Sequence, residues 1–497
     1  MNLASIIDGH PDDAVALVSR GEPTTYGALR DEVDCLRAAL IRLGVAPGDR
    51  IAIVAANTPF FVTAHLAALG AGAVVVPLNP ASPAAELRRE LTAVRAKVAF
   101  VGPSGRDAIA GVDRAAVGLE HVIVSPGLDL DGATGLGDLD GAPPAPVVDR
   151  FADDLAVLIF TAGTAGSPKA AMLSHGNLLA NIEQMQRHPG RALESSDVVL
   201  GALPLFHIFG LNVMLGLTLY AGGSVVLVER FDPSSSLDTI VAREVTLIAG
   251  APPMFAAWAG LHDAPADAMA TVRLAVSGAS ALSDEVASAF GSRFGVEIFE
   301  GYGLTEASPT VTSSVVGEEP KPGSIGVPIP GVQVRLVDEE GEEALVGDAG
   351  EIWVRGPNVF HGYFENTEAT NQALTNDGWL RTGDIAVADD DGYLFIVDRA
   401  KDLIIVSGFN VFPAEVEEAL MEHPGIARAA VVGVANPHSG ESVKAFVVAA
   451  PGNHLEEDQI IDFCAERLAR YKCPTKVMLV GEIPEGLGGK LLRRALR

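Results

Sequence analysis

The sequence feature that most constrains the fold is an alternation of helical patterns with short runs of Val, Ile and Leu, continuing to about residue 390. Three of these runs are 50–54, 224–228 and 274–277. Such runs are typical of strands that are buried on both faces, and the helical segments between them supply crossover connections. The alternation therefore predicts an α/β fold in which parallel-rich sheets are covered by helices.

The end of the chain follows a different pattern and predicts a second domain. With 497 residues, the chain is too long for one ordinary hydrophobic core. After a boundary near 399–402, we expect a helix, two strands and a further helix, at 413–421, 429–434, 443–449 and 455–468. The prediction is a large N-terminal domain, 1–398, and a small α+β C-terminal domain, 399–497.

Two segments need an interpretation of their own. The longest apolar run, 60–78, contains His65, two glycines and a proline, so we expect a buried helix to Leu69, a turn and a strand, and not a membrane span. The stretch 102–150 is rich in Gly, Pro and Asp, and we expect it to loop over the surface.

Composition excludes several classes of partner. The formal charge of -29 argues against a general nucleic-acid binder and against attraction to anionic membranes. Cys35, Cys464 and Cys473 have no metal-ligand spacing, and their odd number does not suit a disulfide framework. No signal peptide is visible at the amino terminus, so a reducing cytoplasm is the expected compartment.

A loop with small residues and one lysine follows the apolar run 155–160, which predicts a buried strand. Its sequence from Thr161 to Lys169 is TAGTAGSPK, which does not fit a Walker A loop. Glycines allow backbone amides to approach an anion, threonines donate hydrogen bonds and lysine adds charge. Taken alone, the segment fits either a phosphate-binding loop or a flexible surface loop.

A hairpin is predicted near the end of the large domain. The strand-like segments 385–388 and 393–397 are separated by three aspartates and a glycine, which favour a turn. Folding this hairpin brings Asp384 and Arg399 together. The pair could be an ordinary surface ion pair or part of a site.

Ordered motifs along nearly the whole chain resemble those of the adenylate-forming superfamily of acyl-CoA synthetases, adenylation domains and luciferases. The matching segments are LGAG and VPLNP at 69–80, the loop at 161–169, LPLFH at 203–207, EGYGLTE at 300–306, TGD at 382–384, DRAKD at 398–402 and GK at 489–490. Fatty acyl-CoA ligases are the most similar members. The resemblance implies a large domain and a small mobile C-terminal domain that turns about a hinge at Lys401.

The resemblance also implies a binding site for ATP and Mg²⁺. Its phosphate contacts would come from Thr161, Gly163, Thr164, Gly166 and Lys169. Its nucleoside contacts would come from Gly278, Ala279, Tyr302, Asp384 and Arg399. Tyr302 would stack on adenine, and Asp384 would accept hydrogen bonds from the ribose hydroxyls. Thr305 would contact the α-phosphate, Glu306 would hold Mg²⁺, and Lys490 would bridge carboxylate and phosphate as charge develops. Lys490 also fits a simple basic tail.

The implied reaction is a two-step ligation that consumes a carboxylic acid, ATP and coenzyme A. An acyl-AMP forms first, and a thiol then displaces AMP. The expected acyl pocket consists of His207, Gly210, Gly278 and Gly303. His207 is also expected among the catalytic residues, with Thr305, Glu306 and Lys490. His207 stands where amino-acid-activating relatives place an aspartate, which disfavours amino acids and suits a fatty or aryl tail; taken alone it equally fits a buried core histidine. Gly408 is expected beside the pantetheine of coenzyme A.

Two alternatives stay open. The chain could be an acyl-AMP ligase that loads an acyl carrier protein, although no carrier segment follows Lys490. It could also be a non-catalytic nucleotide-binding homologue, because Ala162, Ala165 and Ala170 replace the serine, threonine and glycine common in the phosphate loop. Retention of Glu306, together with Asp384 and Lys490, speaks against the second alternative. Acyl chain length and oligomeric state do not follow from the sequence.

Overall fold

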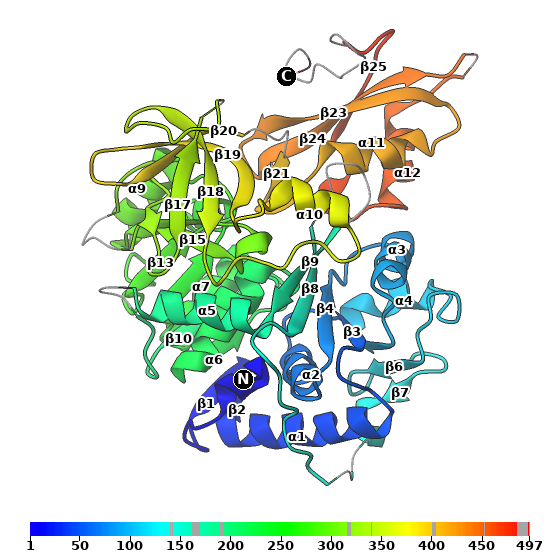
Figure 1. The fold of residues 1–497 in the computed structure, drawn as a ribbon, viewed down its shortest axis with the longest axis vertical. Coiled ribbons are helices and arrows are strands. Elements are labelled where there is room, and N and C mark those ends of the chain that lie inside the picture. The colour runs from blue at the N-terminus through cyan, green and yellow to red at the C-terminus, as the bar shows by residue number, and fades with distance from the viewer. Residues whose placement is uncertain are drawn as a thin grey trace.

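The computed structural model describes residues 1–139, 141, 143–161, 169–188, 192–315, 320–338, 340–399, 404–451, 453–484 and 496. At 397–399, 410 and 414 it describes the backbone alone. Within these residues the strands form four sheets, and three of them belong to the large domain (Figure 1).

The largest sheet has nine strands and a mainly parallel centre. Antiparallel strands stand at both of its ends. In spatial order the strands are β16 (Val327–Pro328), β15 (Thr310–Ser313), β14 (Ile298–Gly303), β13 (Leu274–Ser277), β12 (Leu247–Gly250), β10 (Val198–Gly201), β11 (Ser224–Leu227), β1 (Val15–Ser19) and β2 (Glu22–Thr25).

The second sheet has seven strands, of which all but the last pair are parallel. In spatial order they are β7 (Thr134–Gly135), β6 (His121–Val124), β5 (Val98–Val101), β3 (Arg50–Val54), β4 (Val74–Leu78), β8 (Leu155–Thr161) and β9 (Lys169–Ser174). The antiparallel β8–β9 hairpin therefore ends this sheet at the edge that carries the expected phosphate loop.

Helix α2 (Pro59–Gly70) joins the two large sheets into one hydrophobic core. From Phe60 to Gly70 every residue of the helix is buried, and its apolar side chains belong to a cluster that includes residues of both sheets. A helix that is apolar on all sides is typical of the interior of a large domain. The expectation of a helix, a turn and a strand within 60–78 is confirmed. Among the described residues, no helix has the length and apolar character needed to cross a bilayer.

The remaining helices cover the sheets and connect their strands. Leu87 and Leu91 of α3 pack with Ile109 of α4 on the face of the seven-stranded sheet opposite α2. The helices of the large domain are α1 (Tyr26–Arg42), α2, α3 (Ala84–Val94), α4 (Arg106–Ala110), α5 (His175–Gln186), α6 (Leu217–Ala221), α7 (Pro233–Ala242), α8 (Pro252–Ala259), α9 (Asp284–Phe294) and α10 (Thr367–Ala373). A π-helical segment, η4 (Phe209–Gly216), precedes α6.

A four-stranded antiparallel sheet completes the large domain. Its strands, in order, are β17 (Gln333–Val337), β18 (Ala349–Arg355), β19 (Leu380–Ala388) and β20 (Leu394–Arg399). Asp384 and Arg399 are Cα partners in the register of β19 and β20, so the hairpin prediction is confirmed.

The small domain has its own sheet and its own hydrophobic cluster. Its sheet runs β22 (Phe409–Val411), β21 (Ile404–Val406), β24 (Gly440–Ala449) and β23 (Ile426–Asn436), and β25 (Lys476–Leu479) pairs with β24. Helices α11 (Pro413–Met421) and α12 (Glu457–Ala465) pack beside each other. In Figure 1 this domain, in orange and red, lies over the edge of the large domain formed by α3 and the β8–β9 hairpin.

One expectation about the fold is wrong. The stretch 102–150 is not only surface loop, because His121–Val124 forms strand β6 inside the seven-stranded sheet. Val122, Ile123 and Val124 are buried there. A run of three β-branched residues fits a covered strand even between segments rich in glycine and aspartate.

Candidate active site

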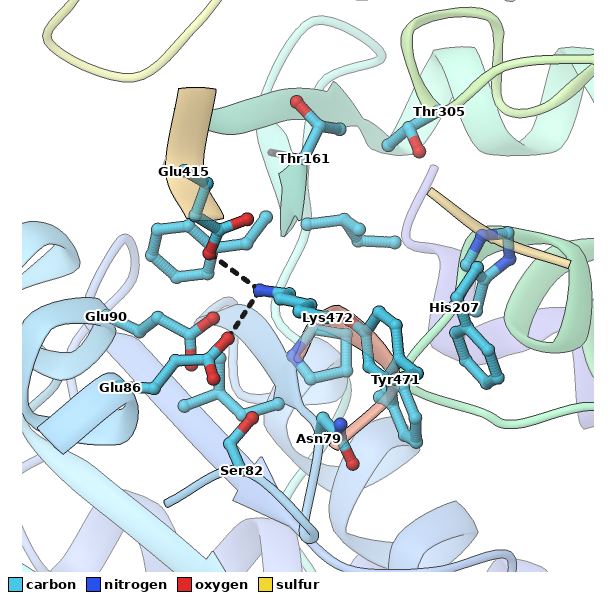
Figure 2. Close-up of a pocket in the computed structure, with 16 residues that line it drawn as sticks. Asn79, Ser82, Glu86, Glu90, Thr161, His207, Thr305, Glu415, Tyr471 and Lys472 are labelled. Carbon is cyan, nitrogen blue, oxygen red and sulfur yellow. Dashed lines mark hydrogen bonds and ion pairs between the residues drawn. The ribbon is translucent and has the colours of Figure 1, made fainter. Parts of the chain in front are cut away.

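A cavity of about 90 Å³ lies where the small domain meets the large domain (Figure 2). Its large-domain wall includes the carboxyl ends of β4 and β8, together with His207 and Thr305. Its small-domain wall includes Phe409, Glu415 and Lys472. In open α/β sheets, ligands bind in the crevice outside the carboxyl ends of the strands. The cavity therefore lies where this fold class is expected to bind a ligand.

The ends of the predicted phosphate loop meet beside this cavity. Thr161 ends β8, Lys169 begins β9, and the two residues are Cα partners in the hairpin. The Thr161 hydroxyl lies 3.4 Å from the carbonyl oxygen of Lys169, to which it donates, and Thr161 also lines the cavity. The loop between them, with Gly163, Thr164 and Gly166, lies outside the described residues. Phosphate binding by this loop stays a prediction.

Two residues that are expected to bind the nucleoside contact each other directly. Tyr302 on β14 donates a hydrogen bond from its phenol to Oδ2 of Asp384 on β19, at 2.6 Å. Arg399 stands opposite Asp384 on β20. The two sheets thus bring together residues 82 positions apart. Their contacts with adenine and ribose stay predictions.

Glu306 is held in place by a residue that sequence reasoning missed. Tyr363 donates a hydrogen bond from its phenol to Oε1 of Glu306 at 2.6 Å, and its ring lies 5.3 Å from the Lys169 ammonium. Burial, followed by the nearby Glu306 charge, raises the pKa of Tyr363 well above its usual value, so the phenol remains a donor. Tyr363 therefore connects the predicted metal-binding carboxylate to the lysine that follows the phosphate loop.

The donors around Glu306 fit a magnesium ion whose shell is completed by substrate. Mg²⁺ is usually bound by one or two carboxylates, with phosphate oxygens and water as its other ligands. Within the described parts of the chain, no group of three or more His, Cys, Asp or Glu side chains is suited to a metal. Glu306 is a single carboxylate, oriented by Tyr363 and beside the predicted phosphate loop. This arrangement agrees with a Mg²⁺ ion bound jointly by the protein and the phosphates of the substrate, and not with one enclosed by protein ligands alone.

His207 is neutral in this environment. It lines the cavity, and burial lowers its pKa to about 4. Its Nδ1 accepts a hydrogen bond from the Phe209 amide at 3.3 Å, which leaves the proton of the neutral ring on Nε2. The residue comes shortly before the π-helical segment η4, and short π-helices are frequent at functional sites.

The three glycines expected in the acyl pocket have different surroundings. A Cβ on Gly210 would lie 2.2 Å from the Pro204 carbonyl oxygen, and one on Gly303 would lie 2.3 Å from that of Pro309. At both positions the backbone leaves no room for a side chain. Gly278, in contrast, faces the Phe209 ring, and a Cβ added to it would lie 3.1 Å from the nearest ring carbon. Gly278 therefore packs against Phe209. Neither these two residues nor Gly210 and Gly303 line the cavity of about 90 Å³, and the acyl pocket stays a prediction.

The turn with Gly408 reaches into the large domain. Gly408 joins β21 to β22 with a φ of +86°, a left-handed conformation that favours glycine. A Cβ added to it would lie 3.0 Å from the Cβ of Ala251 and 3.6 Å from that of Ala279. These alanines closely follow β12 and β13, at the carboxyl ends of the nine-stranded sheet. The structure thus brings Gly408 against the expected nucleotide-binding segment.

A second group missed by sequence reasoning is a buried charged cluster at the cavity. Glu86 and Glu90 of α3 lie with Glu415 of α11 around Lys472 of η6 (Arg470–Lys472) (Figure 2). The spacing of Glu86 and Glu90 predicts that they share one face of a helix. Their partner is 386 positions away from Glu86, so no local pattern could identify it.

Two residues expected to act with the small domain are not placed. Lys401 and Lys490 lie outside the described residues, and so does most of the predicted hinge. Their assignments stay predictions.

Comparison with known families identifies the chain. The family model described as AMP-binding enzyme matches residues 4–364, which is most of the chain, and the model of the AMP-binding enzyme C-terminal domain matches residues 415–490. This chain belongs to the AMP-binding enzyme family. The resemblance to the adenylate-forming superfamily is therefore confirmed.

Relatives of this AMP-binding enzyme align over nearly its whole length. A feruloyl-CoA synthase from Amycolatopsis sp is 37% identical over 487 residues, which cover 97% of this chain and 95% of the relative. A long-chain-fatty-acid–CoA ligase from Salmonella typhimurium is 34% identical, covering 98% of this chain and 91% of the relative. The solved amide bond synthetase McbA from Marinactinospora thermotolerans has a TM-score of 0.90 and 30% identity, covering 100% and 99% of the two chains.

Proposed function

We propose that this AMP-binding enzyme is an ATP-dependent carboxylate–CoA ligase that activates an apolar acid, fatty or aryl, as acyl-AMP and transfers it to coenzyme A. Relatives named as CoA synthase and CoA ligase support this reaction. The observation that carries the proposal is the position of Gly408 against Ala251 and Ala279. A thiol guided by the small domain would pass this glycine on its way to an acyl group at the carboxyl ends of the parallel strands.

In the first half-reaction, the carboxylate attacks the α-phosphorus of ATP, acyl-AMP forms and pyrophosphate leaves. Thr161, Lys169 and the loop between them bind the β- and γ-phosphates, and Thr305 donates to the α-phosphate. Lys490 stabilises the negative charge that develops as the carboxylate attacks. Its role is electrostatic, because its ammonium acts on a charge that exists mainly in the transition state.

Glu306 would hold Mg²⁺, which would supply positive charge to the phosphates. Tyr363 keeps one oxygen of Glu306 engaged at 2.6 Å and so fixes the orientation of the carboxylate. Tyr302 and Asp384 bind the adenosine, with Gly278 and Ala279 beside the base.

In the second half-reaction, the sulfur of coenzyme A attacks the acyl carbonyl and AMP leaves with the electron pair of the broken C–O bond. Gly408 lies beside the pantetheine arm, where a side chain would obstruct the approach. The second half-reaction needs Gly408 at the site and the first needs Lys490, so the small domain turns about Lys401 between the two steps.

The acid is apolar in this proposal because His207 stands where amino-acid-activating relatives place an aspartate, and a neutral imidazole has no negative charge to pair with a substrate ammonium. His207 is neutral at physiological pH, since burial holds its pKa at about 4. Phe209, whose ring packs against Gly278, is close in sequence to His207 and offers an apolar surface that would suit an aromatic ring or an alkyl chain. The three free cysteines are compatible with work in a reducing cytoplasm.

The test is carboxylate-dependent release of pyrophosphate from ATP, measured with acids from acetate to palmitate and with aryl acids. We expect release with apolar acids, and consumption of free coenzyme A with formation of one thioester per AMP. Pyrophosphate release without consumption of free coenzyme A would reject coenzyme A as the acceptor. A carrier protein and an amine would then be tested, the latter because McbA is an amide bond synthetase. Absence of release with every acid would reject the ligase assignment.

A further inference from the structure

A buried lysine of the small domain, Lys472, forms an ion pair with α3. Lys472 donates from Nζ to Oε1 of Glu86 at 2.5 Å and to Oε1 of Glu415 at 2.8 Å (Figure 2). The second oxygen of Glu86, Oε2, accepts the amide of Ala469 at 2.8 Å. The side chain of Lys472 is 9% exposed and that of Glu86 is 5% exposed. Glu86 therefore uses both carboxylate oxygens to contact η6 and the residue before it.

The two carboxylate partners of Lys472 belong to different domains. Glu415 lies on α11 of the small domain and stays beside Lys472 wherever that domain moves. Glu86 lies on α3 of the large domain, so its contact exists only when the small domain has this orientation. Lys472 thus has one permanent partner and one that depends on the domain arrangement.

Aromatic stacking connects this ion pair to the turn at the active site. Tyr471, next to Lys472, stacks on Phe409 with 4.6 Å between the ring centroids. Phe409 also stacks on Phe206 of the large domain at 6.3 Å, and it directly follows Gly408. The segment with Lys472 therefore fixes the turn that reaches Ala251 and Ala279. Losing one member of a buried ion pair is costly because the other charge is left uncompensated.

We propose that Glu86 is the anchor on the large domain for Lys472, and that this pair is a positioning element for the thiol-transfer step. The pair holds the small domain where Gly408 faces the acyl group, and it separates when the domain turns for adenylation. This inference rests on the proposed two-step reaction. Both side chains line the candidate cavity, and in this proposal they act through the placement of the β21–β22 turn.

The experiment compares Glu86→Ala with Arg88→Ala in the full chain. Arg88 is an exposed residue of the same helix and is the matched control. Single-turnover measurements follow acyl-AMP formation and, separately, transfer of preformed acyl-AMP to coenzyme A. We expect Glu86→Ala to slow transfer at least about tenfold more than it slows adenylation. For Arg88→Ala we expect the ratio of the transfer rate to the adenylation rate to equal that of the wild type.

A double-mutant cycle with Lys472→Met tests the pair itself. If Lys472 positions the domain through Glu86, the combined variant should slow transfer no more than Lys472→Met alone. Additive losses, or a Glu86→Ala variant whose two half-reactions fall equally, would overturn the inference. A wild-type enzyme that makes acyl-AMP without passing it to coenzyme A would instead overturn the proposed function, so the two failures are distinguishable.

Discussion

The interior of the small domain and its contact with the large domain are built from different side chains. The interior is mainly aliphatic, with residues such as Leu420 and Val431 completely buried. The contact instead uses aromatic rings and charges, among them Phe409, Tyr471 and Lys472. The charged members of the contact, Glu86 and Lys472, are buried like the interior, whereas Phe409 and Tyr471 are half-buried.

The difference indicates which contacts are permanent. Exposing an aliphatic interior costs roughly 25 cal/mol for each Å² of apolar surface, so the small domain remains folded as a unit. Charged groups such as Glu86 and Lys472 regain hydration when they separate, which offsets much of the lost attraction. A charged and aromatic contact is therefore suited to a domain that leaves and returns, as the two half-reactions require.

The largest expected effect is a selective loss of adenylation. Lys490→Ala should slow acyl-AMP formation by about 10³-fold, because its charge acts mainly at the transition state. Transfer of supplied acyl-AMP to coenzyme A should remain, since no nucleophile attacks the α-phosphorus in that step. Single-turnover pyrophosphate release provides the measurement. Release within a few-fold of wild type would show that the assignment of Lys490 is wrong.

A substitution in the contact between the two domains should slow transfer and leave adenylation. Gly408→Leu places a side chain 3.0 Å from Ala251 and forces a left-handed residue to carry a branched group. We expect transfer to fall by about 10²-fold while adenylation continues. Equal loss of both half-reactions would mean that the substitution disrupts the fold. It would contradict a contact between the Gly408 turn and the large domain that is needed for transfer alone.

A change in the interior should not separate the half-reactions. Leu420 is completely buried on α11, and Leu420→Ala should lower the free energy of unfolding by about 2–5 kcal/mol. Both half-reactions should then fail together as the temperature rises. Calorimetry of the full chain provides the measurement, with Met421→Ala as the control because Met421 is 46% exposed. Equal destabilisation by the two variants would contradict the contrast between interior and contact.

The smallest expected effect is a pH dependence of the contact. Burial, followed by the charge of Glu86, raises the pKa of Glu90 to about 8; Lys472, Glu415 and Arg89 are its other charged neighbours. Away from the small domain, the pKa of Glu90 should return to about 4.3. Docking therefore takes up a proton at Glu90. The contribution of Glu90 to docking is fully present below about pH 4 and is lost as pH rises to about 8.

The variant Glu90→Gln tests this linkage, because an amide keeps the neutral state at every pH. Between pH 6 and 8, the transfer rate of the wild type relative to Glu90→Gln should fall by about threefold or more. Using this ratio removes the ionisation of the coenzyme A thiol, which is common to both proteins. A constant ratio across the range would show that docking is not coupled to Glu90.

Local patterns in the sequence determined most of the secondary structure and one long-range pairing. The runs at Arg50–Val54 and Leu274–Ser277 are strands with the expected bounds, and Pro413–Met421 is the expected helix. The register that pairs Asp384 with Arg399 follows from a turn of Asp and Gly between two strands. These features depend on residues that are near one another in the chain, so periodicity and turn chemistry suffice to predict them.

Only the tertiary structure decided which charged and polar side chains meet. Tyr363 reaches Glu306 across 57 positions, and Lys472 reaches Glu86 across 386. The neutral state of His207 and the raised pKa of Glu90 depend on burial, which is set by the sheets and domains packed around them. A local pattern reports the face on which a side chain lies, but its partner and its solvation depend on how distant segments of the chain are placed.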